Sequence, residues 1–167
     1  MIRNKWKTVI NLYLSGCVRC LDTLLRLLLK RKSPETPELQ IMISRDEILM
    51  GRDKQYPLDG TLQVNLEKLL RAVNKFRAVW GKPMKVTSGY RPAAINATVK
   101  GAATKSNHTV CLAVDFADSD GKLAEYCLKN LKLLEEFGIW LEDPAFTKGW
   151  VHMQVVPPRS GSRVFKP

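Results

Sequence analysis

Cysteine is scarce in this sequence, with four residues in a chain of 167. So few cysteines do not build the disulfide framework that stabilises many small secreted domains. Cys17 and Cys20 have the spacing of half a zinc or redox site, but neither a second cysteine pair nor a nearby histidine completes it. We therefore predict that all of the cysteines are free thiols, namely Cys17, Cys20, Cys111 and Cys127.

The sequence also lacks a long uninterrupted apolar run, although a transmembrane helix needs about 20 predominantly apolar residues. The most apolar region is interrupted by Asn11, Arg19, Asp22 and Arg26. From Trp6 to Leu28, apolar residues instead recur every three or four positions, which is the period of an amphipathic helix. We predict that residues 1–32 form a basic amphipathic helix that binds a membrane surface or a protein partner.

A lipoprotein-type processing site at Leu14-Ser15-Gly16-Cys17 is an alternative interpretation of this region. The apolar segment before it is short and contains Asn11, and a leucine-rich helical pattern continues after Cys17, where a lipoprotein has a polar tether. The amphipathic helix is therefore preferred. Prolines then interrupt the helical pattern, so residues 33–40 are predicted to be a linker and residues 41–167 a folded domain.

Acidic residues are fewer than basic ones, 16 against 27, which gives a formal net charge of +11. The excess is concentrated in the first 34 residues, whose net charge of +7 leaves only +4 for the rest of the chain. Neither zinc-finger spacing nor an interleaved pattern of basic and aromatic residues accompanies this charge. We therefore predict no specific nucleic-acid partner.

Internal repeats and a regular alternation of strands and helices are absent as well. Helical spacing predicts one helix over residues 61–80 and another over residues 121–137. A capping box at Ser44 and Glu47 predicts a short helix through Met50. Strands are predicted over residues 84–88, 111–116, 138–143 and 150–156. This mixture favours an α+β fold, in which a small and mostly antiparallel sheet packs against helices.

Two of the predicted strands carry polar side chains that suggest a site. Asp115 interrupts the apolar run LAVDF, and a buried carboxylate without a partner is costly. In WVHMQVV, the last predicted strand, Val151, Met153 and Val155 share one face, while Trp150, His152 and Gln154 share the other. The one other histidine is His108. Two imidazoles and a carboxylate are good zinc ligands, and they leave the fourth tetrahedral position open for water, as in catalytic zinc sites.

These residues belong to a longer pattern, Ser106-x-His108-x-x-Cys111-x-Ala113-x-Asp115, followed by Trp150-Val151-His152. The pattern resembles the zinc D-alanyl-D-alanine carboxypeptidase family, whose motif runs Ser-x-His-x-x-Gly-x-Ala-x-Asp and later Trp-x-His. The upstream stretch TSGYRP is also similar, so the resemblance extends from residue 41 to the C-terminal end. The family includes van-type dipeptidases, D,D-carboxypeptidases and phage endolysins that cleave L-alanyl-D-glutamate bonds, and its fold is shared with the hedgehog signalling domain.

The resemblance implies a role for each residue of the site. His108, Asp115 and His152 would be the zinc ligands, Arg91 would contact the substrate and stabilise the charged intermediate, and the Ser106 hydroxyl would hold the substrate. Bound zinc lowers the pKa of its water to about 7 and polarises the scissile carbonyl, so that hydroxide attacks at neutral pH. A protein group must still accept the proton of that water.

Two positions depart from the family pattern. The family usually has Glu or Asp three residues before the last zinc histidine, or His two residues before it, where this chain has Gly149 and Trp150. Of the nearby carboxylates, Glu142 and Asp143, we prefer Glu142 as the general base because it reaches further; a role in a surface turn is the alternative. The second departure is Cys111, which replaces a glycine of the family motif.

The resemblance therefore predicts a zinc D,D- or L,D-peptidase, either a carboxypeptidase or an endopeptidase. Its substrate would be the stem peptide of bacterial peptidoglycan, cleaved at amide bonds that involve D-amino acids. We expect an endolysin-like or virion protein of a bacteriophage or prophage, which acts at the cell wall or periplasm and is attached through residues 1–32 to a membrane or a partner. The alternative is a structural or virion module that keeps the zinc-peptidase fold and has lost hydrolysis, an interpretation that Gly149 favours.

Overall fold

The structure, a computed structural model, describes residues 42–167. The predictions for residues 1–32, for the linker 33–40 and for Cys17 and Cys20 lie outside the described residues. The described elements are α2 (Arg45–Leu49), η2 (Arg52–Lys54), α3 (Gly60–Trp80), β1 (Val86–Ser88), α4 (Ala93–Asn96), η3 (Asn107–Val110), β2 (Ala113–Ala117), α5 (Lys122–Lys129), α6 (Leu131–Glu136), β3 (Trp140–Glu142), β4 (Trp150–Gln154) and β5 (Val164–Phe165).

Capping residues explain where the helices α2 and α3 begin. In the capping box of α2, the Glu47 backbone N–H donates to Ser44 Oγ at 3.2 Å, and the Ser44 N–H donates to the Glu47 carboxylate at 2.7 Å. The longest helix, α3, begins after Asp59, whose side chain accepts from the backbone N–H of Leu62, and ends at Gly81 in the left-handed region. Both predicted helices are therefore confirmed.

Within residues 42–167, five strands form one sheet in the order β1-β2-β4-β3-β5. The pairings β1–β2, β2–β4 and β3–β4 are antiparallel, and only β3–β5 is parallel. The centre of the sheet is the five-residue pairing of β2 with β4, in which Asp115 lies directly opposite His152. The predicted α+β fold with a mostly antiparallel sheet is confirmed.

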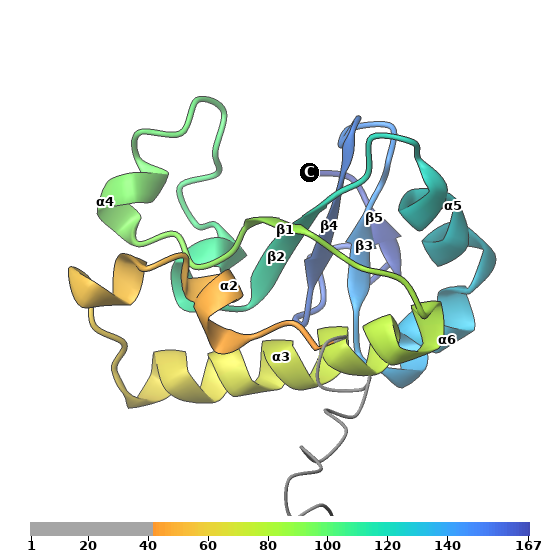
Figure 1. The fold of residues 1–167 in the computed structure, drawn as a ribbon. Coiled ribbons are helices and arrows are strands. Elements are labelled where there is room, and N and C mark those ends of the chain that lie inside the picture. Colours follow the sequence, from red (N-terminus) through yellow and green to blue (C-terminus); the bar gives the residue numbers. More distant parts are fainter. Residues whose placement is uncertain (1–41) are drawn as a thin grey trace, which may run out of the picture. The chain divides into compact units, whose positions relative to one another are not determined.

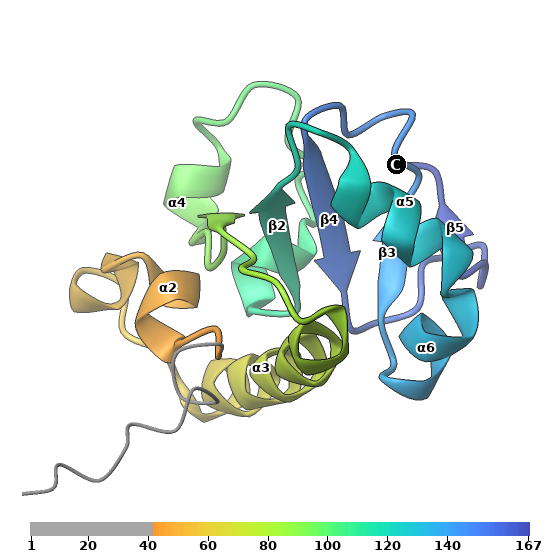
Figure 2. The same cartoon turned by 45° about the vertical axis from the view of Figure 1, so that its right-hand side comes forward.

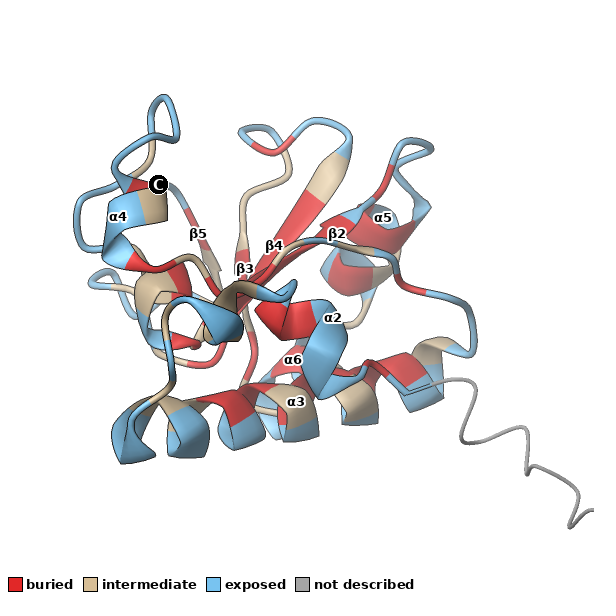
Figure 3. Cartoon of the chain, turned by 60° about the vertical axis from the view of Figure 1, so that its left-hand side comes forward, coloured by how far each residue is buried: buried red, intermediate tan, exposed pale blue. Residues whose placement is uncertain are grey.

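Helices surround the sheet in an arrangement that Figures 1 and 2 show from two sides. The long helix α3 passes along the sheet, α2 contacts β1, and α5 and α6 contact β4 and β3, respectively. Figure 3 shows that the buried positions of α3 face the sheet and that its exposed positions face outward. These buried positions follow helical spacing and are Leu66, Leu69, Ala72, Val73, Phe76 and Arg77.

The core fixes which face of each central strand is available for chemistry. On β2, Val114 and Phe116 are fully buried in the apolar cluster, and on β4 the same is true of Val151 and Met153. Since successive side chains of a strand point to opposite faces, the residues between them project away from this cluster. The predicted alternation of the last strand is therefore confirmed, and it sends a histidine to the non-core face.

The strands β1, β3 and β4 are shorter than predicted, and the structure differs more substantially from the predicted elements in two places. The helix predicted over residues 121–137 is divided into α5 and α6, because Asn130 leaves helical geometry with φ −126° and ψ 44°. The strand predicted from Cys111 begins only at Ala113, because Cys111 ends η3 in the left-handed region. The short elements α4 and β5 gave no periodic signal in the sequence. No helix within residues 42–167 combines the length and apolarity that crossing a membrane requires.

The backbone conformation of Cys111 explains why the family motif has glycine at this position. Its φ of 57° lies in the region that glycine adopts at no steric cost, and its side chain is fully buried. Burial raises the pKa of the Cys111 thiol to about 12. Burial likewise raises the pKa of Cys127 to about 12, and both are free thiols as predicted.

This strain predicts an unusual order of stabilities at position 111. Alanine normally stabilises a regular position relative to glycine, but an L-residue in the left-handed region costs about 1–2 kcal/mol. Cys111→Gly and Cys111→Ala both remove the thiol, so a comparison of the two isolates the backbone strain. We expect Cys111→Gly to be more stable than Cys111→Ala by about 1 kcal/mol in urea unfolding. An alanine variant as stable as the glycine variant, or more so, would contradict the strained turn.

Candidate metal centre

The three predicted zinc ligands converge in the folded chain. One ligand atom each from His108, Asp115 and His152 lie within 4.8 Å of one another. His108 Nε2 is 3.3 Å and His152 Nδ1 is 2.7 Å from the same carboxylate oxygen, Oδ1 of Asp115. All three residues are buried, with exposed fractions of 2%, 7% and 8%. Buried polar side chains at this spacing form a compact set of nitrogen and oxygen donors.

The sheet register brings two of these ligands together. Asp115 of β2 and His152 of β4 are direct partners across an antiparallel pair, so their side chains leave the sheet on the same face. The third, His108, comes from η3, which Ser106 caps by accepting from the His108 backbone N–H at 3.4 Å. The turn at Cys111 then leads from η3 into β2.

The loop after β1 holds His108 in position. His108 Nδ1 is 2.8 Å from the Gly89 carbonyl oxygen, which can only accept, so Nδ1 carries the proton and Nε2 keeps its lone pair for the site. The backbone N–H of Arg91 donates to the His108 carbonyl at 3.0 Å. Gly89 approaches α2 so closely that a Cβ atom there would lie 2.0 Å from the Ile48 carbonyl oxygen. Only glycine fits this contact.

The electrostatics of the site favour an ionised carboxylate. Burial alone would raise the pKa of Asp115, but its close contacts with His108 and His152 outweigh burial and lower this pKa to about 2. An ionised carboxylate surrounded by two imidazoles is a donor set that suits zinc. The second nitrogen of each imidazole also contacts a hydrogen-bond acceptor, as is usual for metal-bound histidines.

The chemistry of the donor set therefore fits a metal ion, and comparison with known proteins names the family. A family model described as Peptidase M15 matches residues 40–153, more than half of the chain. The chain belongs to the peptidase M15 family. M15 peptidases are zinc enzymes, so zinc is the metal that this His-Asp-His group holds. No match was found among curated proteins or among solved structures.

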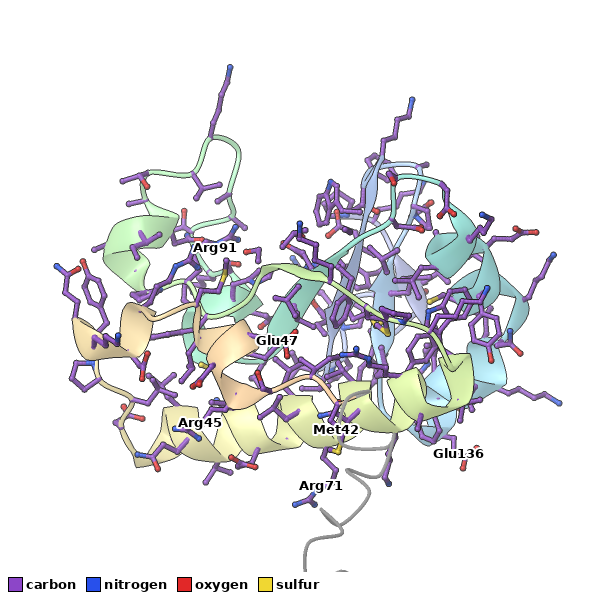
Figure 4. The ribbon with its side chains drawn as sticks, viewed as in Figure 1. Met42, Arg45, Glu47, Arg71, Arg91 and Glu136 are labelled. Atoms are coloured by element: carbon purple, nitrogen blue, oxygen red, sulfur yellow. The ribbon has the colours of Figure 1, made fainter. Side chains whose placement is uncertain are left out.

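All six site residues chosen from the sequence line one cleft of this M15 peptidase, with a volume of about 1030 Å³. They are Arg91, Ser106, His108, Asp115, Glu142 and His152. Figure 4 shows Arg91 near the connection between β1 and α4, well away from Arg45 of α2 and Arg71 of α3. Its Nη2 donates to Ser106 Oγ at 3.1 Å, so Arg91 and Ser106 occupy one side of the cleft as a pair.

Glu142 and Asp143 occupy different environments in this M15 peptidase. Glu142 is half-buried on β3 and lines the cleft, and burial raises its pKa, a shift that the charges of the two site histidines oppose. Asp143 instead accepts from the backbone N–H of Ala145 at 3.0 Å, which makes it a turn residue. Gly149, at the position of the usual family base, has a φ of 85°, which a carboxylate-bearing residue rarely adopts.

Sequence reasoning did not assign several residues that complete the cleft. Lys100, Lys105, Arg159 and Lys166 are exposed and line it together with the exposed ring of Phe146. These residues come from loops and the C-terminal segment, so no periodic pattern pointed to them. Gln154 also lines the cleft, and its signal was visible, because the alternation of β4 gives it the same face as His152.

Gly89→Ala is expected to damage the metal site through the backbone. The added Cβ would collide with the Ile48 carbonyl, so the end of β1 must shift and carry the Gly89 carbonyl away from the His108 ring. We expect a loss of about 1–3 kcal/mol in unfolding free energy and a fall of about tenfold or more in zinc affinity.

Gly60→Ala is the matched control for this substitution. A Cβ at Gly60 meets no atom within 4 Å, and helix α3 begins there. Zinc affinity, measured by competition with a chromophoric chelator, should stay at the wild-type value in this control. Wild-type affinity in the Gly89 variant as well would contradict the role assigned to the Gly89 carbonyl.

The low pKa of Asp115 predicts acid sensitivity in the metal-free protein. Because the folded-state pKa of about 2 lies below the ordinary aspartate value of 3.8, ionised Asp115 contributes stability above pH 3.8 that is lost as pH falls toward about 2. Urea unfolding at a series of pH values should therefore show a stability difference between wild type and Asp115→Asn that narrows over this interval. A constant difference would mean that the carboxylate has an ordinary pKa.

Proposed function

We propose that this zinc peptidase hydrolyses amide bonds involving D-amino acids in the stem peptides of bacterial peptidoglycan. The observation that carries the proposal is the single cleft lined by the three ligands together with Arg91, Ser106 and Glu142. A volume of about 1030 Å³ lies at the upper end for small-molecule sites, so it suits a peptide better than a single amino acid.

Glu142 is the group that we propose as the general base. Zinc, when bound, supplies the Lewis acid that activates water and polarises the scissile carbonyl. Glu142 lines the same cleft, and burial raises its pKa toward the range in which a carboxylate exchanges protons efficiently near neutrality. In this proposal Glu142 takes over the proton-transfer role for which Gly149 has no side chain.

Arg91 and Ser106 are proposed to orient the substrate. Within residues 42–167, Arg91 Nη2 donates to Ser106 Oγ, while the buried Arg91 Nε has no hydrogen-bond partner. A guanidinium has five N–H donors, and the bond to Ser106 uses one, so others remain for a carboxylate or for the oxyanion that develops on the scissile carbonyl. Ser106 can accept this bond and still donate its own hydroxyl proton to substrate.

The charge of the cleft supports an acidic substrate. Its lining contains five basic side chains but two carboxylates, and one of the latter, Asp115, is a zinc ligand. Stem peptides carry free carboxylates, which such a lining attracts. We further propose a phage or prophage enzyme that acts at the cell wall, with the basic segment 1–32 attaching it to a membrane surface or a partner protein.

A module that binds zinc without hydrolysing peptides is the second candidate, favoured by the glycine at position 149. Metal content and mass spectrometry of peptidoglycan fragments after incubation distinguish the two. Zinc that is retained by wild type and lost in His108→Ala, together with no cleaved fragment, would support the module and contradict the enzyme. The cleaved fragments, where they occur, identify the bond.

Glu142→Gln tests the proposed base directly. This change keeps the size of the side chain and removes its ability to accept a proton, so kcat should fall by about 10²- to 10⁴-fold with zinc content unchanged. Asp143→Asn is the matched control, because the neighbouring carboxylate serves a turn, and it should retain wild-type turnover. Equal turnover in wild type and Glu142→Gln would remove Glu142 from the mechanism.

A further inference from the structure

Gln154 makes three specific contacts beside the metal site that the zinc chemistry described above does not use. It ends β4 two residues after His152, on the same face, and only 5% of its surface is exposed. Its Nε2 donates to the Val156 carbonyl at 2.8 Å, and its Oε1 accepts from Asn107 Nδ2 at 2.9 Å. The same Oε1 is 3.4 Å from His152 Nε2. A buried amide with both ends engaged has one orientation.

That orientation determines which nitrogen of His152 carries a proton. The Val156 carbonyl can only accept, so the amide NH₂ group must face it and the amide oxygen must face His152. The oxygen is itself only an acceptor, which requires His152 Nε2 to be the donor. The nitrogen left for zinc is Nδ1, which lies 2.7 Å from Asp115 Oδ1. Without zinc this short contact needs a proton between the nitrogen and the carboxylate, and zinc would take the place of that proton.

We propose that Gln154 is a positioning residue that fixes the tautomer and ring orientation of His152 for zinc, and that Asn107 holds Gln154 in place. The site then treats its two histidines alike: the Gly89 carbonyl fixes His108 with Nε2 toward the metal, and the Gln154 amide oxygen fixes His152 with Nδ1 toward it. In this proposal Gln154 acts through His152 rather than as a metal ligand. The inference concerns zinc binding and does not depend on which amide bond is cleaved.

Zinc affinity measured by chelator competition tests this proposal with two substitutions. Gln154→Leu removes the acceptor, and we expect zinc affinity to fall by about 10- to 100-fold. Gln154→Glu keeps an acceptor for His152 but loses the donor to the Val156 carbonyl, so its zinc affinity should remain within about threefold of wild type. If Gln154 serves only to hold the Val156 backbone, the Glu variant will lose as much affinity as the Leu variant, and the proposal is overturned.

Nuclear magnetic resonance of the zinc-loaded protein gives a second readout that does not involve affinity. With ¹⁵N-labelled histidine, the Nε2 proton of His152 should be protected from solvent exchange in wild type and in Gln154→Glu, and should exchange rapidly in Gln154→Leu. A wild-type spectrum in which His152 carries its proton on Nδ1 would overturn the proposal, even if the leucine variant fails to fold.

Asn74→Ala controls for the loss of an amide clamp elsewhere in the fold. Asn74 lies on α3 and is not one of the zinc ligands. Its side chain accepts from the backbone N–H of Ile43 and donates to the Ile43 carbonyl. We expect this variant to lose stability without a change in zinc affinity. A comparable loss of affinity in Asn74→Ala and Gln154→Leu would attribute the effect to general destabilisation and contradict the positioning role.

Discussion

The antiparallel pairing of β2 with β4 is the interaction on which the metal site depends. It places Asp115 opposite His152 at the centre of the sheet, while the neighbouring positions of both strands fill the apolar core. A shift of register by one residue would bury the carboxylate and the imidazole among apolar side chains. The packing that stabilises the sheet therefore also enforces the geometry of two zinc ligands.

The remaining ligand is held by a series of backbone contacts rather than by the sheet itself. Gly89 packs against the carbonyl of Ile48 in α2, and its own carbonyl orients the His108 ring. Arg91 follows in the same loop and bonds to both the His108 carbonyl and the Ser106 hydroxyl. The stretch TSGYRP therefore supports His108 structurally, and it also supplies Arg91 to the cleft.

The departures from the family pattern have backbone explanations. Gly149 and Cys111 both have positive φ, and glycine adopts this region without strain whereas other residues do not. At position 149 this conformation disfavours the carboxylate residue that the family motif usually has. At position 111 it explains why the family motif has glycine. Glu142 reaches the same cleft from β3, a different strand. A missing side chain in a motif is therefore weak support for lost catalysis when the fold brings another carboxylate to the site.

Much of the fold could be predicted because the relevant forces are local. The capping box at Ser44 and the long apolar stripe of α3 need only neighbouring residues to specify a helix. The two-residue strand β5 could not be predicted, because its pairing with β3 is a contact with a distant part of the chain. The break at Asn130 was not predicted either, because helical spacing continues on both sides of it. Short elements with little local preference are decided by tertiary packing.

The sequence by itself determined the zinc ligands, because two histidines and an aspartate stand in one extended motif and the alternation of WVHMQVV gives His152 a polar face. Only the tertiary structure decided which nitrogen of each imidazole faces the metal, which carboxylate lines the cleft, and that basic loop residues surround it. The reason is physical: a ligand's identity is a property of its side chain, whereas its tautomer, orientation and charge environment are set by atoms that the chain brings together from far apart.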